Sequence, residues 1–176
     1  MQNHRKPLKR SAALIALVCL LASCGGGAKS GGGGHAQFGD ILDAGSLVGL
    51  FQANGLPVGK YQVYNASTDP NRLLGRPGLY TSKSNFIDTR IDQSGFAGEK
   101  TIDTEQGGSV EVFASEGDAK RRADDVRSIT RGSALFAEYS YLRDRVFLRL
   151  SKELTPKQAK AYERLMRSLP ARPSGY

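Results

Sequence analysis

The sequence predicts an α+β domain: an antiparallel sheet of about five strands, joined as a meander, with helices packed on one face. Five short segments alternate between apolar and polar side chains, as strands do when one face of a sheet is buried. Three longer segments repeat apolar residues at helical spacing. Their order along the chain is helix, three strands, helix, two strands, helix, which is typical of a sheet covered by helices.

The first predicted helix covers residues 41–54, with Asp40 as its N-cap. Gly55, followed by Pro57, supplies a stop signal at its end. The residues expected on its buried side recur at helical spacing and are Ile41, Ala44, Leu47, Val48 and Phe51. We expect this helix to cover the sheet that follows it.

Alternating side chains predict three strands in the middle of the chain, over 60–65, 85–91 and 109–114. The 67–84 stretch contains two proline-bearing turn sequences, so we expect it to be irregular. Residues 92–107 carry Gly, Asp and Glu and are expected to form a loop. Long connections therefore separate these three short strands.

A second helix is predicted over 116–129, where Ser115 is the N-cap and Asp118 follows three residues later. The residues expected on its buried side are Ala119, Ala123, Val126 and Ile129. Two further strands, 135–142 and 145–151, are expected to form a hairpin. A single long strand is the alternative for this stretch.

The last predicted helix covers 156–169. Thr155 is its N-cap, Pro156 occupies the first helical position, and Gln158 completes a capping box. Its apolar side holds Ala161, Tyr162, Leu165, Met166 and Leu169, and its basic side holds Lys157, Lys160, Arg164 and Arg167. A basic amphipathic helix can lie on a membrane surface. We expect instead that its apolar side packs on the sheet and that its charges are solvated.

The first 23 residues have the three parts of an export signal. An uncharged run over 12–22 follows four basic residues, Arg5, Lys6, Lys9 and Arg10, and small residues come after it. A transmembrane helix is the alternative for this run. Crossing roughly 30 Å of hydrocarbon takes about 20 residues, however, and the run is too short for that.

Leu21-Ala22-Ser23-Cys24 resembles the lipobox of bacterial lipoproteins, in which the cysteine becomes the lipidated N-terminus. The resemblance implies cleavage before Cys24, more than one acyl chain there, and a location on the extracytoplasmic side of the cell membrane. An ordinary secretory signal with an incidental cysteine is the alternative. Residues 24–39 would then be a flexible Gly-rich tether, 40–170 a single domain, and 171–176 a disordered tail.

Charge and cysteine content limit the function classes. The 176-residue chain has a formal net charge of +8, but the basic residues of the signal would be removed with it. An exported protein rarely meets nucleic acid, so the remaining positive charge favours anionic lipid headgroups or wall polymers. Of the two cysteines, Cys19 belongs to the signal and Cys24 would carry lipid. We therefore expect the domain to fold without a disulfide.

Histidine is nearly absent, because His4 lies in the signal and His35 on the tether. Nucleophilic triads need a positioned imidazole, and zinc sites typically need His or Cys ligands. We therefore expect no such catalytic site, no metal and no cofactor. A glycosidase needs only two carboxylates; the candidates are Asp88, Asp92, Asp103, Glu105 and Glu111. Solvated surface acids are the alternative that we favour for this set.

Positive and aromatic side chains gather near the end of the irregular 67–84 stretch. Arg and Tyr often carry interface energy, and binding often uses loops on a rigid scaffold. We expect a contact surface for an envelope protein or an anionic wall polymer, made of Arg72, Arg76, Tyr80 and Lys83. The alternative is a structural crossover, in which Leu73 and Leu74 pack into the core while the arginines are solvated.

The sequence LLGRPGLYTSK at 73–83 resembles a stretch of small secreted or lipid-anchored actinobacterial proteins of unassigned activity. The resemblance covers 54–169 and supplies no catalytic residue. Together these observations indicate a lipid-anchored cell-envelope protein that acts as a non-catalytic binding or assembly module. An envelope hydrolase that uses a carboxylate pair on wall glycans is the alternative.

Overall fold

The structure is a computed structural model that describes residues 43–132 and 137–169. The predicted signal, tether, Asp40, Cys24 and C-terminal tail lie outside these residues. The order of helices and strands is the predicted one. In chain order the elements are α1 (Ala44–Ala53), β1 (Val58–Val63), β2 (Tyr80–Asp88), η2 (Ser94–Phe96), η3 (Thr104–Gln106), β3 (Gly107–Phe113), α2 (Glu116–Arg131), β4 (Glu138–Arg143), β5 (Val146–Ser151) and α3 (Pro156–Ser168), where η marks a short 3₁₀ helix.

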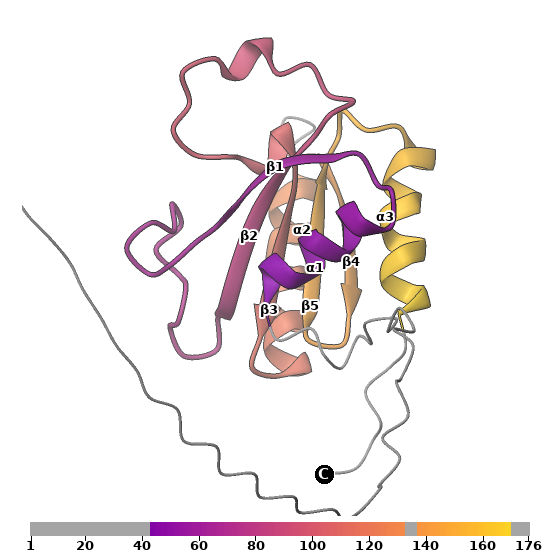
Figure 1. Cartoon of the computed structure of the whole chain (residues 1–176). Helices are drawn as coiled ribbons and strands as arrows, with labels where there is room; N and C mark the ends of the chain where they lie inside the picture. The colour runs from indigo at the N-terminus through magenta and orange to yellow at the C-terminus, as the bar shows by residue number, and fades with distance from the viewer. Residues whose placement is uncertain (1–42, 133–136, 170–176) are drawn as a thin grey trace, which may run out of the picture. The chain divides into compact units, whose positions relative to one another are not determined.

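The five strands form one antiparallel sheet in the order β1-β2-β3-β5-β4 (Figure 1). The predicted α+β class is thus confirmed, as is the hairpin of β4 and β5. The expected simple meander is wrong, because β5 rather than β4 lies beside β3. Since β5 is antiparallel to both neighbours, β3 and β4 run parallel and are joined by α2, as parallel strands require a crossover.

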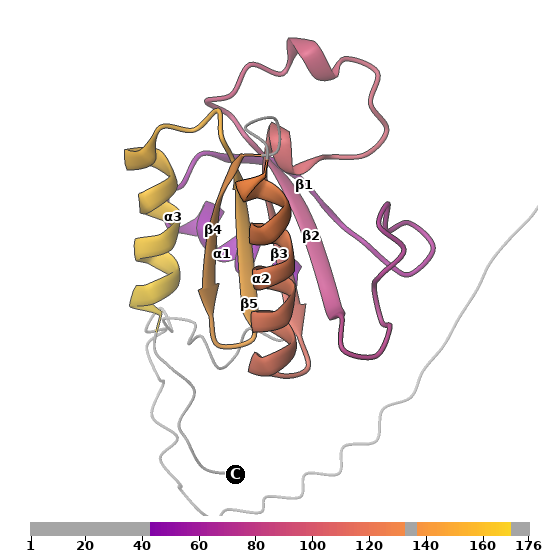
Figure 2. The same cartoon turned by 180° about the vertical axis from the view of Figure 1, so that it is seen from behind.

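The helices cover both faces of the sheet. Helices α1 and α3 lie on one face and α2 lies on the other, as the two opposite views show (Figures 1 and 2). The prediction of helices on one face therefore holds for α1 and α3 but not for α2. The reason lies in the central strands, which bury apolar side chains on both sides: Val112 and Leu148 contact the α1 and α3 side, whereas Phe113 and Phe147 contact α2.

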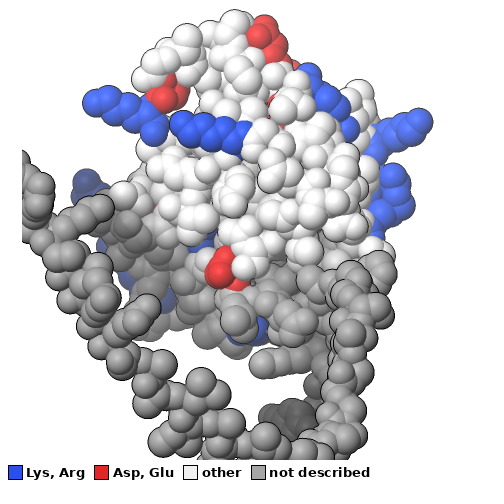
Figure 3. Space-filling view, viewed as in Figure 1, with Lys and Arg blue, Asp and Glu red and all other residues white. Residues whose placement is uncertain are grey.

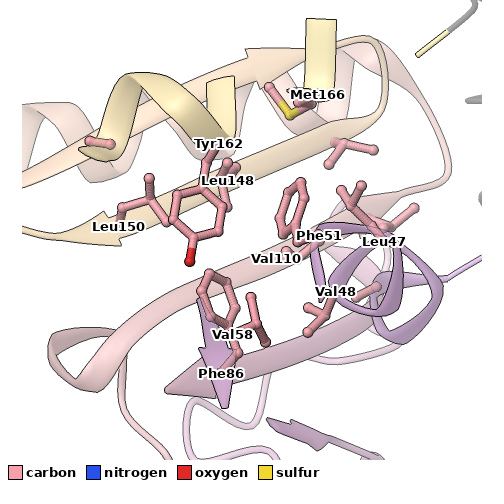
Figure 4. Packing of buried hydrophobic residues seen from close by; sticks show 14 of the residues in the cluster. Leu47, Val48, Phe51, Val58, Phe86, Val110, Leu148, Leu150, Tyr162 and Met166 are labelled. Carbon is pink, nitrogen blue, oxygen red and sulfur yellow. The ribbon is translucent and has the colours of Figure 1, made fainter. Parts of the chain in front are cut away.

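Aromatic rings form the centre of the core on the α1 and α3 face (Figure 4). The ring of Tyr162 lies 5.2 Å from that of Phe51 and 5.5 Å from that of Phe86, measured between ring centres. The Tyr162 hydroxyl donates a hydrogen bond of 2.7 Å to Asp88, whose carboxylate also accepts two hydrogen bonds from the Arg90 guanidinium. These contacts join α1, β2 and α3, so the polar end of a buried tyrosine has its partner.

Most predicted helix signals are confirmed. Ser115 caps α2 by accepting from the Asp118 amide, and Thr155 forms the capping box of α3 with Gln158. Helix α1 is capped by Asp43, which accepts from the Ser46 amide, so the prediction of Asp40 as N-cap is wrong. The deciding interaction is a hydrogen bond to the N3 amide, and an aspartate directly before Ala44 has the right position for it.

Strand bounds and one buried residue differ from the predictions. Strand β2 begins at Tyr80, not at residue 85, because Tyr80 pairs with Phe113 and Lys83 with Glu111 on β3. The irregular stretch is correspondingly shorter. Ile129 was expected inside and is 60% exposed. It lies in the last turns of α2, beyond the part of the helix that packs on Phe113 and Phe147.

Helix α3 packs its apolar side against the sheet, as expected. Tyr162 and Met166 are fully buried, and Leu165 is half-buried. The four basic residues of the helix are exposed, and Lys and Arg side chains project at the side of the domain where α3 lies (Figure 3). Among the described helices, none is long and apolar enough to cross a membrane.

Candidate functional site

A cleft of about 800 Å³ lies on the α2 face of the sheet. Side chains from β2, β4 and β5 form its floor. The second half of α2 forms one wall, and the connection between β2 and β3, which contains both 3₁₀ helices, contributes the other. Figure 2 shows this face, with α2 in front of the sheet and the connection extending beyond the ends of the strands. The volume falls in the range of small-ligand sites, roughly 300–1,000 Å³.

The cleft exists because the α2 face of the sheet is apolar at one end and polar at the other. At one end, Ala119 and Ala123 of α2 pack on Tyr80, Phe113 and Phe147. At the other end the same face carries polar and charged side chains, which are Lys83, Asn85, Ser109, Glu111 and Arg149. Helix α2 has no apolar surface to pack against there. A charged floor cannot be covered by an apolar helix without a large desolvation cost.

The first charged group of the floor is organised by Asp69. Its buried carboxylate accepts hydrogen bonds from the Tyr80 hydroxyl at 2.7 Å, the Lys83 ammonium at 3.0 Å and the Leu73 amide at 2.9 Å. Burial alone would raise the pKa of Asp69, but these hydrogen bonds hold it well below its usual range. The Lys83 ammonium also lies over the rings of Tyr64 and Tyr80.

A second charged group links four elements through Glu111. Its fully buried carboxylate accepts two hydrogen bonds from Arg122 of α2, at 3.0 and 3.2 Å. Arg149 of β5 lies 3.8 Å from the same carboxylate and donates to Glu138 of β4 at 2.7 to 3.1 Å. Forked arginine–carboxylate pairs of this kind are among the stronger hydrogen bonds in proteins and fix orientation.

The four residues of the predicted contact surface do not lie together on the surface. Arg72 and Arg76 are exposed on the loop before β2. Tyr80 is fully buried and Lys83 is 2% exposed, and both bind Asp69 inside the domain. Asp69 is near these residues in the sequence, but no sequence pattern indicated that it would bind Tyr80 and Lys83 in the interior. Only Lys83 lines the cleft.

The predicted carboxylates are divided between two places. Asp92, Asp103 and Glu105 line the cleft, while Asp88 binds Tyr162 on the opposite face of the sheet and Glu111 belongs to the buried network. The cleft acids also shape the connection that carries them. Asp103 completes the capping box of η3, and two hydrogen bonds from Ser94 lower the pKa of the Asp92 carboxyl.

Sequence reasoning missed Asn85, Arg122, Glu138 and Arg149 as parts of this site. Arg149 interrupts the apolar strand β5 as Glu111 interrupts β3, and a charge in an apolar strand indicates a buried partner. Asn85 gave no such signal. It lines the cleft and is 2% exposed, and its Oδ1 has no hydrogen-bond partner among the described residues. The same holds for the hydroxyl of Ser109, its cross-strand neighbour.

Within residues 43–132 and 137–169, no three His, Cys, Asp or Glu side chains gather as a metal site would require. The lipidation site predicted at Cys24 lies outside those ranges. The chain was also compared with known proteins. No protein-family model matches it, and no significant match was found among curated proteins or solved structures.

Proposed function

We propose that this chain is a lipid-anchored cell-envelope protein whose domain is a non-catalytic binding module. The observation that supports binding is the cleft on the α2 face. Its floor is held rigid by the ion pairs of Asp69 and Glu111, and rigid elements position binding groups more accurately than loops do. A preformed cleft of this size, with polar groups at fixed positions, suits a small ligand.

The proposed location is supported by the lipobox-like sequence before Cys24. We expect the wild-type protein to incorporate a fatty-acid analogue during growth, and Cys24→Ser to incorporate none. The variant should either be released from the membrane or remain as uncleaved precursor, because the modified thiol is the anchor. A wild-type protein that takes up no label would overturn this part of the proposal.

A hydrolase acting on wall glycans is the second candidate, because five carboxylates line the cleft, among them the predicted Asp92, Asp103 and Glu105. A general acid that works near neutral pH needs a raised pKa. The hydrogen bonds from Ser94 instead lower the pKa of Asp92, and Asp103 is engaged as a helix cap. These acids therefore fit the role of structural and binding groups better than that of a catalytic pair.

The experiment compares binding and hydrolysis on the same sample. Full-length protein is incubated with a soluble envelope extract, bound small molecules are identified by mass spectrometry, and new reducing ends are counted. We expect retained ligand without new reducing ends. Ile129→Asp, on the wall of the cleft, should lose the ligand, and Val63→Asp should keep it, since Val63 is similarly exposed (52%) but does not line the cleft. Release of reducing ends by the wild type would favour the hydrolase.

A further inference from the structure

The three cations on the floor of the cleft and its α2 wall each have an anionic partner within the chain. Lys83 is paired with Asp69 at 3.0 Å, Arg122 with Glu111 at 3.0 Å, and Arg149 with Glu138 at 2.7 Å. An incoming anion would have to displace one of these carboxylates, and removing a partner from a buried ion pair is strongly unfavourable. The floor therefore offers polar atoms but no unbalanced positive charge.

The charges nearer the surface make the cleft unfavourable for anions as well. Among the described lining residues, the acids that lie outside the floor pairs are Asp92, Asp103, Glu105 and Glu153. On the cationic side, Arg90 is engaged with Asp88, which leaves the exposed Lys152. Negative charge thus predominates around the opening. Such a field repels a polyanion, whatever the net charge of the whole chain.

The remaining lining is a mixture of apolar surface and uncharged hydrogen-bonding groups. Ile129 is the most exposed of the large apolar residues described, and the half-buried Phe96 also lines the cleft. The uncharged polar groups are the amides of Asn71 and Asn85 and the hydroxyls of Ser94, Thr104, Thr130 and Ser151. A ligand that matches this lining has many hydroxyl groups together with apolar C–H surfaces, which is the chemistry of a sugar ring.

Asn85 and Ser109 add an observation of a different kind. An acceptor oxygen and a hydroxyl, buried at paired positions of β2 and β3, both lack a hydrogen-bond partner among the described residues. Buried polar atoms without partners are rare in native proteins. Of the two residues, Asn85 lines the cleft, whereas Ser109 is fully buried beneath it. A ligand hydroxyl can donate to the Asn85 oxygen if the side chain turns toward the cleft.

We propose that the cleft binds a neutral saccharide of one to a few rings, with its hydroxyls on the Asn85 side of the floor and an apolar ring face against Ile129 and Phe96. The proposal rests on the proposed function, because it names the ligand class of the same cleft. It differs from the anionic wall polymer that the sequence suggested.

The test is a titration of the full-length protein, followed by NMR at the backbone amides of Thr104 and Thr130. The probes are maltotriose and chitotriose as neutral saccharides, polyphosphate as the anion, and tetralysine as the cation. We expect a neutral saccharide to shift both amides, with an affinity that changes less than about twofold on adding salt, because a neutral ligand gains little from screened charges. Polyphosphate should leave both amides unchanged, whereas a shift by tetralysine that disappears on adding salt would report only the exposed acids around the opening.

Matched variants locate the binding. Ile129→Ser should weaken saccharide binding by about tenfold, the effect of losing one buried apolar contact. Val63→Ser should bind like the wild type, and both variants should keep the wild-type melting temperature because both residues are exposed. Equal binding by Ile129→Ser would overturn the assigned cleft.

The outcomes also separate the two proposals. If polyphosphate shifts the cleft amides, or tetralysine shifts them in high salt as well, and neither saccharide does, the saccharide proposal is wrong while a binding cleft stands. If none of the probes and no fraction of an envelope extract shifts them, both proposals are wrong.

Discussion

The two faces of the sheet are stabilised by different kinds of contact. The α1 and α3 face is a continuous apolar core that includes Phe51, Phe86 and Tyr162. The α2 face is apolar only under the first turns of the helix and becomes a set of buried ion pairs beyond them. Apolar contacts are non-directional, so side chains of many shapes can pack together on that face. Ion pairs need particular partners in particular directions, and on the α2 face a cleft remains.

The difference indicates that one face of the sheet supplies most of the stability, while the other carries the proposed function. The apolar face supplies most of the burial of large side chains, which is the main stabilising contribution to folding. The ionic region contributes less net stability, because desolvation of the charges opposes their attraction. Its ion pairs fix the positions of the strands and α2 around the cleft. Changes on the two faces should therefore have different consequences.

The largest effect is expected from Phe51→Ala on the apolar face. Phe51 is fully buried between Phe86 and Tyr162, so its removal leaves a cavity that the neighbouring rings cannot fill. We expect the free energy of unfolding to fall by about 3–5 kcal/mol, measured by urea denaturation. The exposed Val63→Ala is the control and should stay within about 0.5 kcal/mol of wild type. A similarly small loss for Phe51→Ala would contradict the assignment of the main core to this face.

On the ionic face, the result depends on whether one partner or both are replaced. Glu111→Leu leaves the Arg122 guanidinium partly buried without its carboxylate, and should cost about 3 kcal/mol or more. Glu111→Leu combined with Arg122→Met should recover most of that loss, since an apolar pair carries no uncompensated charge. Urea denaturation of both variants and of Arg122→Met completes a double-mutant cycle. Additive losses would show that the two side chains are not coupled.

Local signals in the sequence predicted the elements well, and long-range contacts explain the differences. The capping box at Thr155 and Gln158 needs only four consecutive residues, so the start of α3 was predicted correctly. The pairing of β5 with β3 joins segments far apart in the chain, and neither strand alone determines it. The path of α2 depends on that pairing as well, because the helix joins the parallel strands β3 and β4 and must pass over β5.

The candidate site was harder to predict for the same reason. Tyr80 and Lys83 are residue types that are typical of contact surfaces. Only the fold shows that Asp69 binds both of them inside the domain. Periodicity assigned Ile129 to the buried side of α2, but the apolar part of the sheet ends before its last turns. Glu111 and Arg149 could have been recognised as charges within apolar strands, although their partners could not.

A smaller effect on the ionic face should appear in acid. The hydrogen bonds to Asp69 lower its pKa in the folded state, so its contribution to stability is complete above the unfolded pKa of a carboxyl and is lost as the pH falls below it. We expect a loss on the order of 2 kcal/mol below about pH 4 from this residue. Asp69→Asn should be less stable at neutral pH and show a shallower decline in acid. Parallel pH profiles would exclude Asp69 as the group responsible.

The smallest effect on stability is expected for a Lys–Asp pair that is exposed to solvent. The Lys120–Asp124 pair on the exposed side of α2 is 2.7 Å long, shorter than the 3.0 Å of Lys83–Asp69, yet both its side chains are more than half exposed. If distance determined the strength of an ion pair, Lys120 would matter more than Lys83. Burial decides instead, because water and salt screen the exposed charges and the two side chains lose entropy when they pair. Lys120→Ala should therefore have the same urea midpoint as wild type in low and high salt, whereas Asp69→Asn shifts it clearly in both. A clear shift for Lys120→Ala in low salt would show that the two regions differ less than their burial implies.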